Sequence, residues 1–239
     1  MLPALNEEEA LPLVLGELPE GVCTAVCVVD NGSSDRTPEV ARECGAHVVR
    51  EERRGYGQAC LSGIEWMCSG KGLQPPLRAG DILVFLDADH SDYPEDIHAI
   101  LEPLQSGAAD FVIGSRVLGG ASLEALLPQA WFGNRLACFL MRVLFDARYS
   151  DLGPFRALEV QVLRSLEMGD RTFGWTVEMQ LKAKSLGLRV VEVPVRYRQR
   201  VGKSKITGTI SGTLRAGWKI LGWIGMWRVK TWLRPVRRA

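Results

Sequence analysis

The segment Ile82-Leu83-Val84-Phe85-Leu86-Asp87-Ala88-Asp89 is a run of five large apolar residues that ends in two aspartates. A short apolar run bounded by polar residues is typical of a strand buried on both faces of a sheet. The two carboxylates follow the strand directly and lie two residues apart, so both can face one ligand. Mg²⁺ and Mn²⁺ prefer oxygen ligands and are often held by one or two carboxylates together with phosphate oxygens. The alternative is that these aspartates cap the next helix, as we expect of Asp92 before Pro94.

Outward from this segment, short apolar runs alternate with helical patterns. Alternation of this kind predicts an α/β protein with a mostly parallel sheet covered by helices on both faces. In such sheets ligands bind beyond the carboxyl ends of the strands, where Asp30, Asp87 and the segment 114–116 are expected. The predicted strands are Thr24–Val29, Ala46–Val49, Ile82–Leu86 and Phe111–Ile113, and the predicted helices are Asp35–Cys44, Tyr56–Cys68 and Pro94–Gln105.

The second half of the chain is less regular. Residues Trp131–Phe145 are predicted to form a helix, and Leu188–Tyr197 a strand. Because proline cannot donate to a ladder, Pro194 places that strand at an edge or a bulge. Residues Ile206–Trp232 have the pattern of one or two amphipathic helices.

Composition excludes several classes of protein. The chain has 239 residues, 46% of them hydrophobic and 24% charged, which is ordinary for a globular protein and excludes disorder, collagen and coiled coil. Its six cysteines form no CxxC pair, so we interpret them as small core residues of a protein in a reducing cytosol.

The net charge of +1 conceals two parts of opposite sign. The residues after Glu192 hold twelve of the 29 basic residues and no acidic one, so they carry +12 and the first 192 residues carry −11. A basic tail on an acidic body predicts an anionic partner for the tail. Nucleic acid is not expected, because the body is acidic and no nucleic-acid-binding module is present.

Eight segments together resemble one family in their order and spacing. They are similar to the inverting family 2 glycosyltransferases of GT-A fold, a Rossmann-like α/β fold, and to the branch of dolichyl- and polyprenyl-phosphate hexosyltransferases. The segments are PALNEE (3–8), DNGSSDRT (30–37), RGYGQA (54–59), DAD (87–89) with GSR (114–116), DLGPFR (151–156), TFGWTVE (172–178) and VGKSK (201–205). The resemblance implies a catalytic domain over residues 1–205 and a basic, tryptophan-rich tail over 206–239.

The resemblance implies a nucleotide-sugar donor, with GDP-mannose and UDP-glucose both open, and a divalent metal, Mg²⁺ or Mn²⁺. Asp89 would bind the metal, and Asp87 with Ala88 would contact the donor. A metal at this position offsets charge on the leaving nucleoside diphosphate. The remaining positions that match the donor site are Pro3, Leu5, Glu7, Asp30, Asn31 and Arg54.

For the acceptor, the resemblance implies a polyprenyl or dolichyl phosphate at the cytosolic face of a membrane. A phosphate monoester is largely dianionic at pH 7, so it needs cations rather than a base. The cations that match are Arg116, Arg135, Arg200 and Lys205. A soluble or protein hydroxyl acceptor would instead need a carboxylate base, for which Glu178 is the first candidate and Asp151 the second. A non-catalytic nucleotide-sugar-binding module is the third hypothesis.

Two departures from the family pattern concern the donor site and the first strand. Ser91 stands where family members usually carry glutamine, which affects donor selectivity. Only Met1 and Leu2 precede Pro3, so the first strand is expected to be truncated.

The tail places Ile210, Leu214, Trp218 and Leu221 at helical spacing beside Arg215 and Lys219. This pattern is typical of an interfacial helix on anionic lipid and predicts a peripheral membrane protein. In the alternative the apolar stripe packs on the domain or on a second subunit, which would make a homodimer.

Overall fold

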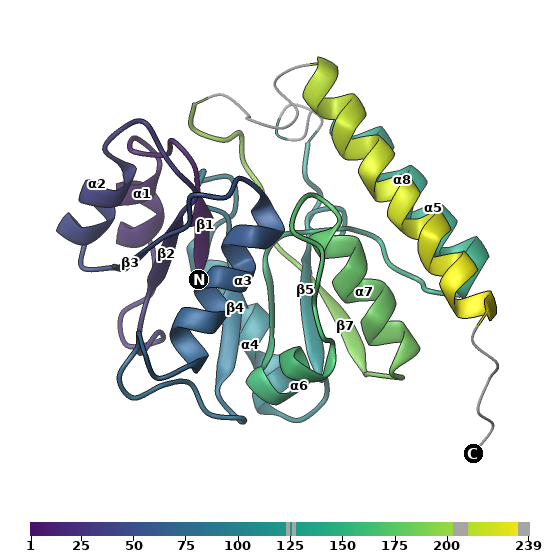
Figure 1. Cartoon of the computed structure of the whole chain (residues 1–239), viewed down its shortest axis with the longest axis horizontal. Helices are drawn as coiled ribbons and strands as arrows, with labels where there is room; N and C mark the ends of the chain where they lie inside the picture. Colours follow the sequence, from purple (N-terminus) through teal and green to yellow (C-terminus); the bar gives the residue numbers. More distant parts are fainter. Residues whose placement is uncertain (123–124, 126–127, 203–209, 234–239) are drawn as a thin grey trace.

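The computed structural model describes residues 1–122, 125, 128–202 and 210–233, and in the last helix the side chains of residues 217–229. Figure 1 shows strands at the centre of the molecule and helices around them. The strands are β1 (Leu2–Ala4), β2 (Cys27–Asp30), β3 (His47–Arg50), β4 (Ile82–Phe85), β5 (Phe111–Ser115), β6 (Arg156–Glu159) and β7 (Val190–Pro194). The helices are α1 (Leu11–Gly16), α2 (Thr37–Glu43), α3 (Tyr56–Cys68), the 3₁₀ turn η1 (Pro94–Asp96), α4 (Ile97–Gln105), α5 (Pro128–Phe145), α6 (Val160–Ser165), α7 (Trp175–Ser185) and α8 (Ile210–Leu233).

The strands form a three-stranded sheet in the order β1-β2-β3 and a four-stranded sheet in the order β4-β6-β5-β7. Met1 joins them, because its nitrogen donates to the Val84 carbonyl at 2.8 Å and its carbonyl accepts from Leu86 N at 3.1 Å. These two bonds follow the parallel pattern and bring β1 beside β4. Among the described pairs only those of β6 are antiparallel, which confirms the predicted mostly parallel sheet.

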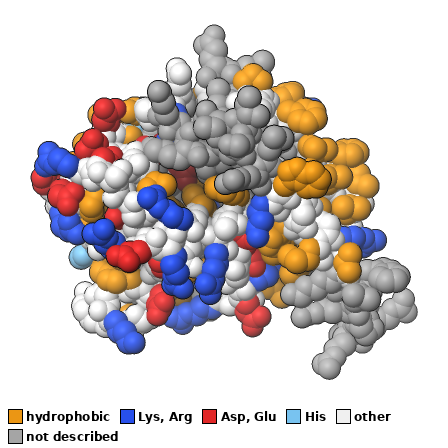
Figure 2. Space-filling model, turned by 45° about the horizontal axis from the view of Figure 1, so that its top comes forward, with side chains coloured by type: hydrophobic (Ala, Val, Ile, Leu, Met, Phe, Trp, Pro, Cys, Tyr) orange, Lys and Arg blue, Asp and Glu red, His pale blue; other side chains and the backbone are white. Residues whose placement is uncertain are grey.

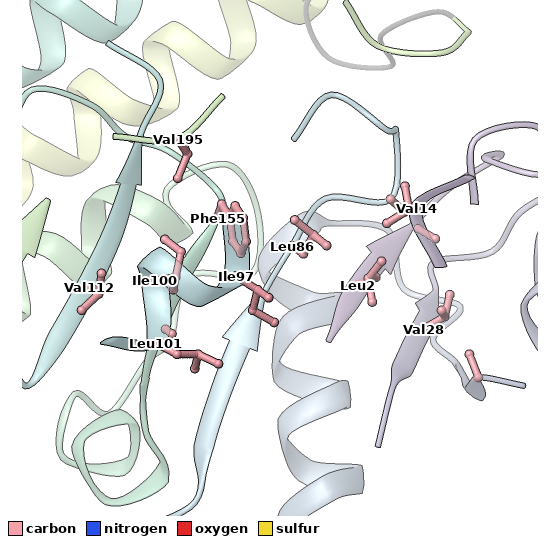
Figure 3. Packing of buried hydrophobic residues seen from close by; sticks show 14 of the residues in the cluster. Leu2, Val14, Val28, Leu86, Ile97, Ile100, Leu101, Val112, Phe155 and Val195 are labelled. Atoms are coloured by element: carbon pink, nitrogen blue, oxygen red, sulfur yellow. The ribbon is translucent and has the colours of Figure 1, made fainter. Parts of the chain in front are cut away.

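Side chains alternate between two cores, one on each face of the sheet. Val28 and Val112 pack with residues of α1, α2 and α4 (Figure 3), whereas Val29 and Ile113 pack with residues of α3, α6 and α7. Successive strand residues point to opposite faces, so runs without polar alternation fit a sheet buried on both sides. A third cluster joins α5, α7 and α8 and includes Trp223, Ile224 and Trp227.

The predicted elements are found, most of them with shifted bounds. Helix α3 has the predicted bounds, and β7 lies at the sheet edge and ends at Pro194, as its proline indicated. The sequence patterns missed α1, β6, α6 and α7. Strand β6 begins with Arg156, an unusual residue for a buried strand, yet that side chain is only 1% exposed. The first strand has three described residues, and its truncation stays a prediction.

In the tail, α8 lies beside α5 (Figure 1). Of the predicted stripe, the side chains of Trp218 and Leu221 are described: Trp218 is 77% exposed and Leu221 is half-buried. The buried residues of α8 are Trp223, Ile224 and Trp227. Helix α8 therefore packs some of its apolar side chains against the protein and leaves others, such as Trp218, exposed. Among the described residues, no helix is both long enough and apolar enough to cross a membrane.

Candidate active site

A cavity of about 230 Å³, here called the carboxylate cavity, lies at the carboxyl ends of β1, β2 and β4. This is the edge of a parallel sheet where ligands are expected. The structure brings together nine residues that the sequence predicted for the donor or phosphate site. They are Pro3, Leu5, Glu7, Asn31, Arg54, Asp87, Ala88, Asp89 and Arg200.

Asp87 and Asp89 are held by different neighbours. The Tyr56 hydroxyl donates to Asp87 Oδ1 at 3.2 Å. Asp89 Oδ1 accepts from the Ser91 backbone nitrogen at 3.0 Å and from its hydroxyl at 2.5 Å. Burial, and next the nearby charge of Asp89, raise the pKa of Asp87 to about 7.

The second oxygen of Asp89 is held by a cation. Arg200 Nη1 lies 3.0 Å from Asp89 Oδ2, and Arg200 Nη2 lies 2.7 Å from Glu7 Oε1. The guanidinium therefore stands between two carboxylates as a positive ion would. The carboxylates of Asp89 and Glu7 offer only oxygen ligands, and the Arg200 guanidinium shows that a positive charge is accommodated between them. Both features fit a hard divalent ion, which Asp89 would bind.

Asn31 builds the wall of the cavity beside α3. Its side-chain nitrogen donates to the carbonyls of Glu51 and Arg53, and its oxygen accepts from Gly55 N at 2.8 Å. Asp30 is almost fully buried and does not line the cavity. Its Oδ1 accepts from Ser33 N, whereas its Oδ2 has no hydrogen-bond partner in the part of the chain that the structure describes.

A second cavity of about 530 Å³, here called the apolar cavity, opens between α5 and α8. Its walls carry Phe132 and Leu136 from α5 and Ile220 and Leu221 from α8, and its polar lining includes the side chain of Arg116. The two cavities share three lining residues, Tyr56, Asp87 and Phe173. A molecule with a charged end and an apolar body could thus reach Asp87 from the apolar cavity.

Arg116 is fixed by a buried carboxylate. Asp151 accepts from Arg116 Nε at 2.8 Å, from Nη2 at 2.7 Å and from the backbone nitrogen at 2.8 Å. Asp151 is fully buried, and its backbone nitrogen donates to Glu192 at 3.1 Å. The Asp151 carboxylate raises the pKa of Arg116 although burial alone would lower it, so Arg116 stays a cation.

The loop 169–174 carries Phe173 to the junction of the cavities. Glu178 holds the loop, because its carboxylate accepts from Gly169 N and from Asp170 N and pairs with Lys182 at 2.8 Å. The loop then packs on α3 so closely that a side chain at Gly57 would meet the Asp170 carbonyl at 2.1 Å. Asp170 also pairs with Lys219 of α8 at 3.3 Å.

Several predicted residues are placed elsewhere. Arg135 is exposed, stacks on Trp131 at 4.6 Å and lines neither cavity. Glu178 also lines neither cavity, and its contacts are those of a loop anchor. Lys205 lies outside the described residues. The predicted cap role of Asp92 is wrong, since the side chain is buried and neither oxygen has a partner among the described residues.

The sequence interpretation did not assign Tyr56, Phe173 and Asn134 to the site. The first two belong to motifs that matched the family, RGYGQA and TFGWTVE, so their signal was present. Asn134 lines the apolar cavity, and its oxygen accepts from Leu152 N at 2.8 Å. A lone asparagine within a helical pattern carries no such signal.

Comparisons with known proteins concern the family of the chain. A family model described as "Glycosyl transferase family 2" matches residues 1–142. An uncharacterised glycosyltransferase of Mycobacterium tuberculosis is 34% identical over 92% of this chain and 96% of its own. An undecaprenyl-phosphate mannosyltransferase of Micrococcus luteus is 32% identical over 89% of this chain and 88% of its own.

Among solved structures, glucosyl-3-phosphoglycerate synthase of M. tuberculosis, in complex with Mn²⁺, UDP-glucose and phosphoglyceric acid, aligns with a TM-score of 0.71. It is 22% identical and covers 94% of this chain and 78% of its own, which shows a shared fold. The fold is GT-A, and the protein is a glycosyltransferase. The chain belongs to glycosyltransferase family 2.

Proposed function

We propose that this glycosyltransferase moves a hexose from a nucleotide-diphosphate sugar, GDP-mannose or UDP-glucose, to a polyprenyl or dolichyl phosphate. The observation that carries the proposal is the apolar cavity, which holds Arg116 and meets the carboxylate cavity at Asp87. The mannosyltransferase of M. luteus, whose name states an undecaprenyl-phosphate acceptor, supports it.

The chemistry follows from the two cavities. An acceptor phosphate oxygen bonds to the anomeric carbon from the face opposite the leaving group, while the bond from that carbon to the diphosphate breaks and its electrons leave with the nucleotide. The acceptor is an anion at pH 7, so no base is needed. Arg116 holds and orients the phosphate, and guanidinium suits this task because it binds oxygens in pairs.

The donor diphosphate would lie near Asp89, Arg54 and Arg200. A bound Mg²⁺ or Mn²⁺, which Asp89 would hold, supplies charge for the diphosphate leaving group. Structures of the phosphoglycerate synthase with Mn²⁺ or with Mg²⁺ and UDP support a divalent ion. Asp87 reaches the junction where the sugar must pass from one cavity to the other.

The products of defined mixtures test this function. The protein is incubated with each nucleotide sugar and with a polyprenyl phosphate, the matching polyprenol or 3-phosphoglycerate, and the products are identified by mass. We expect a hexosyl polyprenyl phosphate. Transfer to the polyprenol would contradict the phosphate acceptor and favour the hydroxyl reading with Glu178 as base, and transfer to 3-phosphoglycerate alone would contradict the lipid.

A pair of variants tests the apolar cavity. Leu221→Asp places a charge in its wall, whereas Leu118→Asp places one at an exposed position outside both cavities. We expect the first variant to raise the KM for a long polyprenyl phosphate about tenfold or more, the equivalent of about 1.4 kcal/mol, and the second to leave it unchanged. Equal effects would contradict the placement of the lipid.

We further propose that the α5–α8 face rests on the cytosolic face of an anionic membrane. Figure 2 shows hydrophobic side chains gathered on one side of the molecule. The large exposed apolar residues of the two helices are Phe132, Phe139, Val143, Trp218, Met226 and Val229. Exposed apolar side chains beside cations such as Arg135 and Lys219 suit an interface with anionic lipid.

Flotation with vesicles of phosphatidylcholine, with and without phosphatidylglycerol, tests the membrane proposal. We expect the protein to float with anionic vesicles and the double variant Phe139→Ser/Val143→Ser to float less. Leu13→Ser, at an exposed apolar residue of α1, is the control. Equal recovery of all three proteins would contradict this surface, and a concentration-dependent dimer that the double variant breaks would assign the face to a second copy instead.

A further inference from the structure

We propose that Arg200 is an exchangeable counter-ion: its guanidinium holds the Asp89 oxygen that would bind a metal, and it leaves this oxygen when a divalent ion binds. The inference rests on the proposed function for the metal, and concerns what this chain's own arginine does. It predicts that metal and donor diphosphate strengthen each other's binding because both act on one guanidinium.

The first observation is the state of the two Asp89 oxygens. Oδ1 is held within its own turn by Ser91, through the backbone nitrogen and the hydroxyl. Oδ2 faces Arg200 Nη1 at 3.0 Å. A divalent ion that binds Asp89 through Oδ2 therefore competes with Arg200 for the same lone pairs, and two cations cannot share them at contact distance.

The second observation is that Arg200 has another anchor. Its Nη2 lies 2.7 Å from Glu7 Oε1, and Glu7 also lines the carboxylate cavity. If Arg200 leaves Asp89, Glu7 keeps the guanidinium at the edge of that cavity. The released Nη1 can then donate to a diphosphate oxygen, and the arginine stays near the donor.

The third observation is an unused donor. Arg200 Nε is buried and has no hydrogen-bond partner among the described residues. A buried donor without a partner is unfavourable, so this arrangement of the side chain is incompletely satisfied. A diphosphate offers several oxygens and can satisfy Nε and Nη1 together, which a single carboxylate does not do here.

Backbone hydrogen bonds fix the segment that carries Arg200. Val201 N donates to the Asp89 carbonyl at 3.0 Å, and Arg198 N donates to the Ser91 carbonyl at 2.9 Å. The strap 198–201 is thus fixed alongside residues 89–91, so a movement of the Arg200 side chain suffices for the exchange.

Binding of Mn²⁺ tests the proposal without any measurement of turnover. Free Mn²⁺ is followed by electron paramagnetic resonance, with the full chain and with Mn²⁺ alone, Mn²⁺ with UDP or Mn²⁺ with GDP. We expect the wild type to bind Mn²⁺ weakly alone and about tenfold or more tightly with the fitting nucleotide, a coupling of ordinary size for two linked sites.

Arg200→Gln removes the competitor. We expect it to bind Mn²⁺ alone at least about threefold more tightly than the wild type and to lose most of the coupling with the nucleotide. The control is Arg196→Gln, because Arg196 lies on the same basic segment, pairs with Glu95 and Asp96 and lines neither cavity. It should behave as the wild type.

The outcomes separate the two proposals. Equal or weaker binding of Mn²⁺ alone by Arg200→Gln, in a variant whose melting curve shows that it is folded, would overturn the exchange and leave the metal proposal standing. No Mn²⁺ binding by any variant, with either nucleotide, would overturn both. If Arg200→Gln does not fold, Arg200→Lys decides, since its single ammonium cannot span Asp89 and Glu7 as two guanidinium nitrogens do, and Mn²⁺ should bind it more tightly than the wild type.

Discussion

Both carboxylate oxygens of Asp151 accept hydrogen bonds from Arg116, Oδ2 from Nε at 2.8 Å and Oδ1 from Nη2 at 2.7 Å. Asp151 is fully buried. The pair points the remaining guanidinium nitrogen, Nη1, away from the carboxylate. Arg116 lines the apolar cavity, so under the proposed function Asp151 would act on the acceptor through the arginine, as a positioning residue.

The first prediction concerns this pair. Asp151→Asn should raise the KM for the phosphate acceptor by about tenfold or more, because Arg116 loses its fixed direction, and should lower the melting temperature, since breaking a buried ion pair costs about 3–5 kcal/mol. The KM for the donor should change little. Steady-state kinetics with each substrate varied in turn, together with thermal melts, give these values.

A matched control is available. Asp110 binds Arg189 in the same bidentate geometry, at 3.2 Å from Nε and 2.7 Å from Nη2. This pair is at the surface and lines neither cavity. Asp110→Asn should leave both KM values unchanged. An Asp151→Asn enzyme with wild-type acceptor kinetics would contradict the positioning role.

The second prediction concerns Phe173, the aromatic ring at the junction of the cavities. Phe173→Ala should lower kcat/KM for both substrates about tenfold or more, because the wall that both share is lost. Phe139→Ala, at an exposed position of α5, should leave the reaction of a water-soluble short-chain acceptor unchanged. An effect confined to one substrate would show that the ring serves one cavity only.

The third prediction separates the two roles of Glu178. As a loop anchor, Glu178 accepts hydrogen bonds from two backbone nitrogens and pairs with Lys182. Glu178→Gln should therefore lower the melting temperature, by about 2–4 °C for each kcal/mol of folding stability that is lost. The pH dependence of kcat should keep its shape. A fall in kcat of about 10²-fold or more, with loss of the acidic limb of the pH profile, would instead identify Glu178 as a base.

The fourth prediction uses the buried side chain of Asp92. Burial, and next the charge of Asp87, raise the pKa of Asp92 well above its ordinary value. A carboxyl group whose folded pKa is raised stabilises the fold while it is protonated, and that contribution is lost as the pH rises through the folded pKa. Asp92→Asn keeps a neutral group and should raise the melting temperature at pH 8 more than at pH 5.

Thermal melts of both proteins across this pH range check the fourth prediction. Asp81, an exposed residue before β4, offers a control, and Asp81→Asn should not change the pH dependence. A melting difference for Asp92→Asn that is equal at pH 5 and pH 8 would show that Asp92 is ionised in the folded protein.

The sequence by itself determined the sheet, its mostly parallel character and the end of the sheet at which the carboxylate cavity lies. Apolar runs such as 82–86 are typical of strands buried on both faces of a sheet, and Asp87 and Asp89 follow such a run directly. Contacts between neighbours in the chain and the period of the apolar pattern carry this information. Nine residues of the carboxylate cavity could be predicted because their motifs resemble those of the family.

Only the tertiary structure decided what the charged side chains do. Arg116 and Asp151 are 35 residues apart, and Arg200 and Glu7 are 193 apart, so no local pattern predicts which carboxylate meets which cation. Packing also turned Glu178 toward its own loop and Arg135 onto Trp131, whereas sequence reasoning had directed both to the substrate. Helix α8 buries one apolar face and exposes another, because α5 and α7 cover only one side of it.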